Sequence, residues 1–155
     1  MPLSAKDRMF NREVEALRAL IQSKAKPFSD DRNAQRERMS RARKDLEYFG
    51  LTYFPHYLDT PPSELHKYFS LRYPQMVLRA SETGEGDREA DAAPRGNAKS
   101  TWTTLILPLW CAAYRHRLFP LIVSETAAQS ADFISFIKAE LETNERLKQD
   151  FPDLC

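Results

Sequence analysis

The pattern of apolar and polar positions predicts two helices near the start of the chain. Apolar residues recur at helical spacing after Ser4, and Pro27 ends this first segment. A second segment starts after the polar residues 29–31 and stops at Gly50, since glycine commonly follows a helix. We therefore expect an N-terminal helical region over residues 1–50.

The next part of the chain reads as a connector, a helix and a polar loop. Residues 51–62 are rich in aromatic side chains and proline, which favours an extended, packed connector. Ser63 caps the helix that follows, and we expect Pro74 to break this helix. Residues 81–89 contain two glycines and are typical of a polar loop.

From residue 90 onward, the pattern alternates between strand and helix. Small apolar residues over 90–93 predict a short strand, and residues 101–114 are apolar on nearly every side, as in a buried helix. Residues 118–123 have the length of a buried parallel strand, with Pro120 favouring an edge position. A capping box at Thr126 starts another helix. This order predicts an α/β fold, a parallel sheet with flanking helices.

Composition excludes several classes of protein. The chain has 155 residues, 42% of them hydrophobic, which suits one domain or one small domain with an appendage. The formal net charge is +1, so overall charge implies no partner. Cys111 and Cys155 make neither a disulfide framework nor a metal cluster, and they fit a reducing cytoplasm. No signal peptide is visible, and the longest apolar stretch, 105–114, is too short to span a membrane.

Positive charges gather on the second predicted helix. One face carries Arg32, Arg36, Arg38, Arg41, Arg43 and Lys44. Glu37, Asp45 and Glu47 are interleaved with these cations, as on an ordinary solvated helix. The same face would also suit DNA phosphate or an acidic partner. The sequence leaves both interpretations open.

Residues 92–101, Ala-Ala-Pro-Arg-Gly-Asn-Ala-Lys-Ser-Thr, carry the candidate chemistry. A bound triphosphate needs main-chain N–H groups, a cation and a hydroxyl for Mg²⁺, and Lys99 and Ser100 supply the last two. Alanine replaces both outer glycines of the G-x-x-x-x-G-K-[ST] pattern, so that Gly96 alone has unrestricted backbone angles. A helix start with a chance Lys-Ser-Thr is the alternative interpretation. The predicted strand and apolar helix on either side favour a phosphate-binding loop.

Three stretches of the chain resemble a known family. They are Tyr53-Phe54-Pro55 with Ser63-Glu64-Leu65-His66, the loop 92–101, and the segment from Ile122 to Pro152. Loops of that family commonly read Pro-Arg-Gly, any residue, Gly or Ala, then Lys-Ser-Thr. Over residues 46–155, the chain is similar to the N-terminal ATPase part of the large terminase subunit of tailed bacteriophages, the motor that pumps DNA into the empty capsid.

The resemblance implies a partial P-loop ATPase domain over 51–155, preceded by the helical region. It implies that ATP and Mg²⁺ bind at the loop, with Lys99 on the outer phosphates and Ser100 on magnesium. Arg95 would sense or stabilise the γ-phosphate, so Lys99 and Arg95 would be the catalytic residues. The nucleotide-binding residues would be Pro94, Arg95, Gly96, Asn97, Ala98, Lys99, Ser100, Thr101, Tyr53, Phe54 and His66.

Several of these roles have a plainer alternative. The resemblance suggests that the adenine base stacks on Tyr53 or Phe54, with His66 assisting, whereas ordinary packing of the connector would also explain these rings. For Arg95, the alternative is a loop charge that faces solvent.

The resemblance is incomplete beyond the loop. The family's second strand, which ends in two acids that hold Mg²⁺ and activate the attacking water, has no match in the sequence, and neither does the nuclease cluster. We therefore expect the front portion of a longer motor, which belongs to an ATPase family but does not turn over ATP alone. The implied partners are double-stranded DNA, the small terminase subunit and the portal protein, with a homo-oligomeric ring, in the cytoplasm of a bacterial host.

Two other functions compete with this interpretation. One is a non-catalytic module, in which the basic helix binds DNA or a protein partner and the phosphate loop is vestigial. The other is an unrelated phosphate-loop kinase, although no arginine-rich lid is visible in the sequence.

Overall fold

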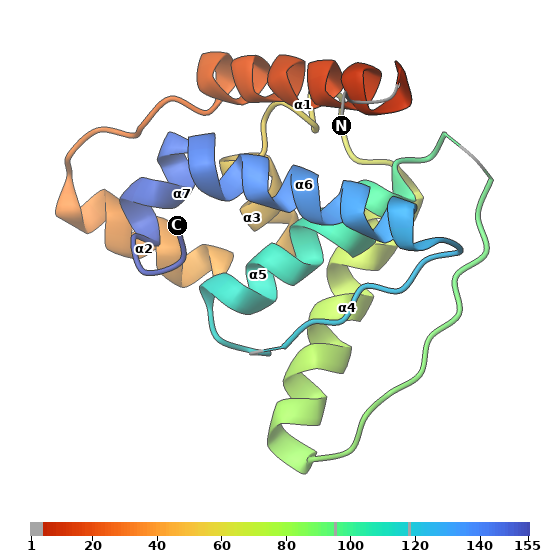
Figure 1. Ribbon diagram of the computed structural model, residues 1–155. Helices are drawn as coiled ribbons and strands as arrows, with labels where there is room; N and C mark the ends of the chain where they lie inside the picture. The colour runs from red at the N-terminus through yellow and green to blue at the C-terminus, as the bar shows by residue number, and fades with distance from the viewer. Residues whose placement is uncertain (1–4, 95, 118) are drawn as a thin grey trace. The chain divides into compact units, whose positions relative to one another are not determined.

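The computed structural model describes residues 5–94, 96–117 and 119–155. The chain divides into two compact units, one from the two ends of the chain and one from its middle, residues 30–122. Throughout the described ranges, all regular secondary structure is helical, and Figure 1 shows helices joined by connecting segments. Residues 30–50 belong to the same unit as the candidate loop.

The first unit packs α1 against α6. Its helices are α1 (Ala5–Lys24), α6 (Ala127–Thr143) and α7 (Glu145–Asp150). Ile21, Ala25 and Ala139 form a fully buried cluster, which Val14 and Leu17 extend. The Thr126 side chain accepts a hydrogen bond from the N–H of Gln129 at 3.2 Å and caps α6. Both helices predicted for these segments are confirmed.

The second unit is built around aromatic side chains. Its helical segments are α2 (Arg32–Ala42), α3 (Leu46–Tyr53), α4 (Glu64–Thr83), a π-helix η1 (Thr101–Ile106) and α5 (Leu107–Ala113). The fully buried rings include Phe49, Tyr53, Phe54, Phe69, Trp102 and Trp110. The indole N–H of Trp110 donates to the Ala42 carbonyl at 2.9 Å, which fixes α5 against the end of α2. The candidate loop therefore precedes a helix that is anchored in this core.

Three predicted helix boundaries in this unit are wrong. The predicted stop at Gly50 does not occur, since α3 continues to Tyr53 and takes in the start of the predicted connector. The helix expected to run to Phe49 is split, because the Asp45 side chain accepts from the N–H of Tyr48 at 2.8 Å and caps a new helix, α3. The expected break at Pro74 does not occur, and α4 continues through it. Phe69, Tyr73 and Pro74 are all buried on one side of α4, so packing offsets the hydrogen bond that proline cannot make.

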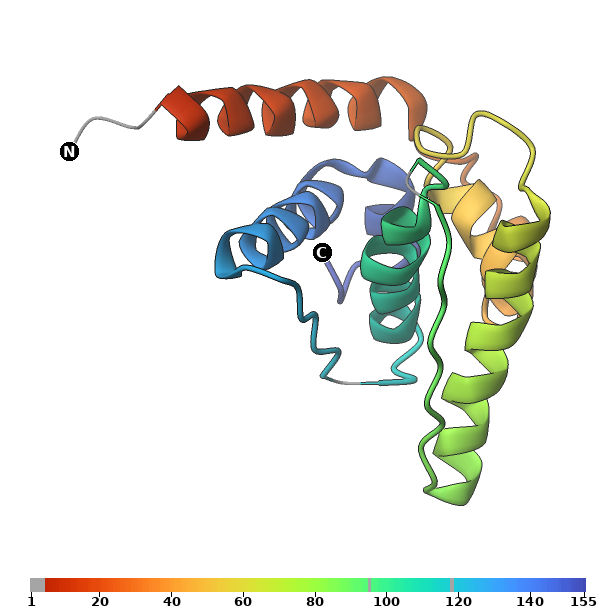
Figure 2. The same ribbon diagram turned by 90° about the vertical axis from the view of Figure 1, so that its right-hand side faces the viewer.

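The predicted α/β fold with a parallel sheet is wrong, since no strand is present in the ranges that the structure describes. Residues 85–94 are extended, but they run along α4 and bond to its side chains (Figure 2). Residues 119–123 are non-helical, and Phe119, Leu121 and Val123 stay 79–88% exposed. Pro94 and Pro120 also have no N–H to give to a ladder. Strand-like patterning without a partner strand does not make a sheet.

Both cysteines are free, and burial raises the pKa of the Cys111 thiol to about 11, as for an inert core residue. None of the helices among the described residues has the length and apolar character needed to cross a membrane.

Candidate phosphate-binding loop

An acidic strap, residues 85–91, holds the chain that leads into the loop. Glu89 accepts hydrogen bonds from the Tyr68 hydroxyl at 2.6 Å and from Nε of Arg72 at 2.9 Å. Acids at alternate positions of the extended strap thus meet side chains at helical spacing on α4. The further contacts are Tyr73 to Asp91 at 2.8 Å and Arg79 to Asp87 at 3.2 Å.

These contacts change the ionisation of the strap. The hydrogen bond from Tyr68, followed by that from Arg72, holds the pKa of Glu89 below its ordinary value. Burial, together with the hydrogen bond to Asp91, raises the pKa of Tyr73. At neutral pH Glu89 therefore presents an ionised carboxylate to the Tyr68 hydroxyl and to the Arg72 guanidinium.

The loop itself closes around the side chain of Lys99. The Lys99 ammonium donates to the carbonyl oxygens of Ala93 and Pro94, the latter at 2.9 Å. The Asn97 amide donates to the same Pro94 oxygen at 3.2 Å. Gly96 has φ +85° and Ala98 has φ +47°, both in the left-handed region. A backbone that reverses hand twice in three residues forms a tight concave turn.

Two main-chain N–H groups of this turn have no acceptor in the part of the chain that the structure describes. Among the described residues, no hydrogen-bond acceptor meets the N–H of Gly96 or Ala98. Gly96, Asn97 and Ala98 are exposed, while Lys99 is half-buried. Free N–H groups in such a turn, with a lysine next in the sequence, favour the binding of an anion.

His66 ties the loop to the start of α4. Its Nδ1 accepts from the N–H of Ser63 at 3.3 Å, so Nε2 carries the proton and donates to the Asn97 carbonyl at 2.9 Å. The imidazole also stacks on Trp102, with ring centroids 5.7 Å apart. His66 therefore lies at the loop, where it positions main chain.

The residues after Lys99 start a continuous helical stretch over 99–113. The hydroxyl of Thr103 donates to the Lys99 carbonyl at 3.0 Å, and that of Thr104 to the Ser100 carbonyl at 2.6 Å. The Ser100 hydroxyl has no partner within the described part of the chain, and it is open to solvent, whereas Thr101 is half-buried. Ser100 therefore remains available as an oxygen ligand for a cation.

Two of the predicted base-binding residues lie in the core, away from the loop surface. Tyr53 and Phe54 are fully buried beside Phe49, with centroid separations of 5.0 and 5.6 Å. In this structure a base would reach them only after the core had moved. Arg95 lies outside the described residues. Where the structure describes side chains, no group of three or more His, Cys, Asp or Glu residues is arranged to hold a metal ion.

A cavity of about 460 Å³ opens beside the loop, between α4 and the helical stretch after Lys99. It is lined by Phe69, Tyr73, Met76, Glu89, Asp91, Lys99, Ser100, Thr103 and Leu107. The sequence did not predict this cavity, because residues 81–89 have the composition of a polar loop, and this composition gave no sign that they pack on α4. One sequence pattern could have predicted it: the acids at alternate positions of the strap can pair with the tyrosines and arginines at helical spacing in residues 68–79.

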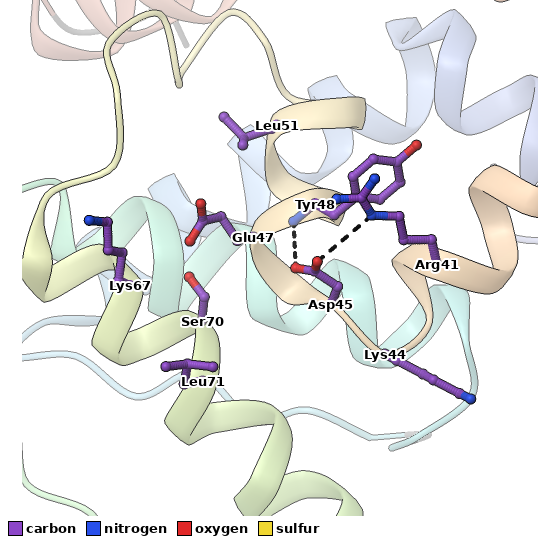
Figure 3. Close-up of a pocket in the computed structure, with 9 residues that line it drawn as sticks. All are labelled: Arg41, Lys44, Asp45, Glu47, Tyr48, Leu51, Lys67, Ser70 and Leu71. Carbon is purple, nitrogen blue, oxygen red and sulfur yellow. Dashed lines mark hydrogen bonds and ion pairs between the residues drawn. The ribbon is translucent and has the colours of Figure 1, made fainter.

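The basic helix contributes to a different cavity, of about 540 Å³, which Figure 3 shows between α3 and α4. The Arg41 guanidinium lies 4.1 Å from the ring centroid of Tyr48 and 4.0 Å from the Asp45 carboxylate. Lys67 pairs with Glu64 at 2.7 Å. This cavity mixes cations with acids, so it is not a uniformly positive groove.

Comparisons of the chain with protein-family models, with curated proteins and with solved structures find no match. Any assignment of function therefore rests on the chemistry of the residues described above.

Proposed function

We propose that residues 92–101 bind ATP with Mg²⁺, and that the chain is the N-terminal ATP-binding portion of a large terminase subunit. In the complete protein, ATP hydrolysis would then drive double-stranded DNA into a viral capsid. The observation that carries the nucleotide assignment is the tight turn before Lys99, in which the N–H groups of Gly96 and Ala98 have no acceptor among the described residues. The terminase assignment rests on the sequence resemblance.

Binding would proceed by exchange at Lys99. In the empty loop, its ammonium is held by two neutral carbonyl oxygens. A phosphate oxygen accepts a charge-assisted hydrogen bond, which is about twice as strong as one between neutral groups. The ammonium would therefore move to the outer phosphates, and the free N–H groups would surround them.

Alanine at position 98 is compatible with this role. Ala98 adopts φ +47° with a side chain of one carbon, at a cost of roughly 1–2 kcal/mol compared with glycine. The loop reaches its turn without the usual last glycine. Ser100 would offer its hydroxyl to Mg²⁺, which takes most of its remaining ligands from phosphate and water.

Binding without turnover is the expected activity of this chain. Phosphoryl transfer needs positioned charge and an oriented water in addition to a loop. The small terminase subunit, the portal protein and a homo-oligomeric ring in a bacterial host cell are the partners that this proposal implies.

Isothermal titration calorimetry with ATP and Mg²⁺ tests the proposal. We expect saturable binding by the full chain and a loss of at least tenfold in affinity for Lys99→Ala, because the cation on the phosphates is gone. Lys138→Ala, an exposed lysine on α6, is the matched control and should bind as the native chain does. Absence of binding at millimolar ATP would refute the nucleotide assignment.

The second candidate is a non-catalytic module that binds DNA or a protein partner and keeps a vestigial loop. The exposed Arg32, Arg36 and Arg43 favour it, whereas Arg38 is buried. DNA affinity should then fall steeply with salt, and Arg36→Ala should flatten that slope by about 0.9. Salt-dependent DNA binding, without detectable binding of ATP, would favour the non-catalytic module over the ATP-binding motor portion.

A further inference from the structure

The cavity beside Lys99 has an apolar floor. Behind this floor, Phe69 and Tyr73 on successive turns of α4 are buried, with their rings nearly parallel, 12° apart, and their centroids 5.0 Å apart. Met76 and Leu107 add flexible aliphatic surface to the same cavity. Met76 and Leu107 are half-buried, so a planar ring system can pack on their side chains and leave water without losing hydrogen bonds from its faces.

The rim of the cavity is polar and comes from the acidic strap. One oxygen of Asp91 accepts from the Tyr73 hydroxyl at 2.8 Å, and the other has no partner among the described residues. A carboxylate with a free oxygen, fixed by a neighbouring hydroxyl, is a natural acceptor for sugar hydroxyls.

The cavity is continuous with the phosphate-binding loop. Lys99 and Ser100 line it and also belong to the loop, so one ligand can occupy both. Its volume of about 460 Å³ lies within the range of roughly 300–1,000 Å³ typical of small-molecule sites. The cavity of Figure 3 shares none of its lining residues with the loop.

We propose that this cavity is the nucleoside subsite: the base lies on Met76 and Leu107, and the ribose hydroxyls donate to Asp91. The phosphates then extend past Ser100 to Lys99 and the free N–H groups. This inference rests on the proposed binding of ATP at the loop. It moves the base away from Tyr53 and Phe54, which are sealed in the core.

The first test compares ATP with inorganic tripolyphosphate, both with Mg²⁺, by calorimetry on the full chain. Tripolyphosphate occupies the loop but has no nucleoside, so ATP should bind about tenfold more tightly or better. Met76→Trp fills the cavity, and it should reduce ATP binding to the tripolyphosphate level while leaving tripolyphosphate unchanged. Retained tripolyphosphate binding also establishes that the variant is folded.

Leu71→Trp is the matched control. Leu71 lies on the same helix, is 68% exposed and lines the other cavity, so this variant should bind both ligands as the native chain does. Equal affinities of the native chain for ATP and tripolyphosphate would overturn the subsite and leave the loop assignment standing. Binding of neither ligand would remove the loop assignment itself.

The second test addresses Asp91. ATP lacking both ribose hydroxyls should bind the native chain several-fold more weakly than ATP, and Asp91→Ala should abolish this difference. Tyr73→Phe keeps the carboxylate and removes the hydroxyl that fixes it, so it should reduce the preference for ATP without abolishing it. If the native chain binds both nucleotides equally, the role of Asp91 is refuted.

Discussion

Two extended segments of this chain carry strand-like sequence patterns, and the structure treats them differently. The acidic strap and the loop residues after it lie on α4, held by hydrogen bonds and ion pairs from side chains. Residues 119–123 have stronger strand patterning, yet their apolar side chains face solvent. Because side-chain contacts take the place of a backbone ladder in the first segment alone, it can position a site.

The largest expected difference between the two regions comes from paired phenylalanine truncations. Phe69→Ala removes a fully buried ring beneath the strap and should cost about 3–5 kcal/mol of unfolding free energy. Phe119→Ala removes a ring that is 88% exposed and should change that energy by less than about 0.5 kcal/mol. Urea unfolding followed by the fluorescence of the buried Trp102 and Trp110 measures both. Similar costs for the two variants would contradict the comparison.

The hydrogen bond between Tyr73 and Asp91 should contribute a smaller amount. Tyr73→Phe keeps the ring that stacks on Phe69 and deletes the hydroxyl, so we expect a loss of about 1 kcal/mol. The same unfolding assay applies. If Tyr73→Phe unfolds at a urea concentration equal to or above that of the native chain, this hydrogen bond does not stabilise the protein.

The dependence of stability on pH should also differ between the acidic strap and residues 119–123. The lowered pKa of Glu89 means that its contribution to stability is fully present above its ordinary value of 4.5 and is lost as pH falls through the lowered value. Carboxyl NMR should give a Glu89 midpoint below 4.5, and Tyr68→Phe should raise it. A midpoint unmoved by Tyr68→Phe would contradict the assigned cause. Residues 119–123 contain no ionisable side chain and should give no such response.

The smallest effect is expected for Leu121→Ser. Leu121 is 79% exposed, so the change should alter the unfolding free energy by less than about 0.5 kcal/mol. A clear destabilisation in the urea assay would mean that this segment is covered in solution, and the contrast with the strap would fail.

The sequence predicted the helices well where local signals decide them. The side chains of Thr126 and Ser63 cap α6 and α4 as expected, because capping involves residues three positions apart. The sheet could not be predicted correctly from residues 118–123, since strand formation depends on a partner that the pattern does not specify. The predicted break at Pro74 was wrong for a similar reason. Burial of Pro74 on α4 outweighs the cost of the main-chain hydrogen bond that proline cannot make.

The candidate site was predicted in part. The sequence indicated Lys99, Ser100 and the turn at Gly96, because a loop motif is local. It indicated His66 without its tautomer or its bond to Asn97. The cavity depends on contacts between the strap and α4, which are set by tertiary packing and not by spacing along the chain.

The paired carbonyls that hold Lys99 set a threshold for whatever enters the loop. An anion that enters the loop has to replace the two hydrogen bonds that the Lys99 ammonium already makes to carbonyl oxygens. Weakly charged ions therefore gain little free energy from this exchange. Dense polyanions gain far more, because they engage the ammonium and several amides together. If the loop binds ATP as proposed, it would select its ligand by charge density before the nucleoside makes contact.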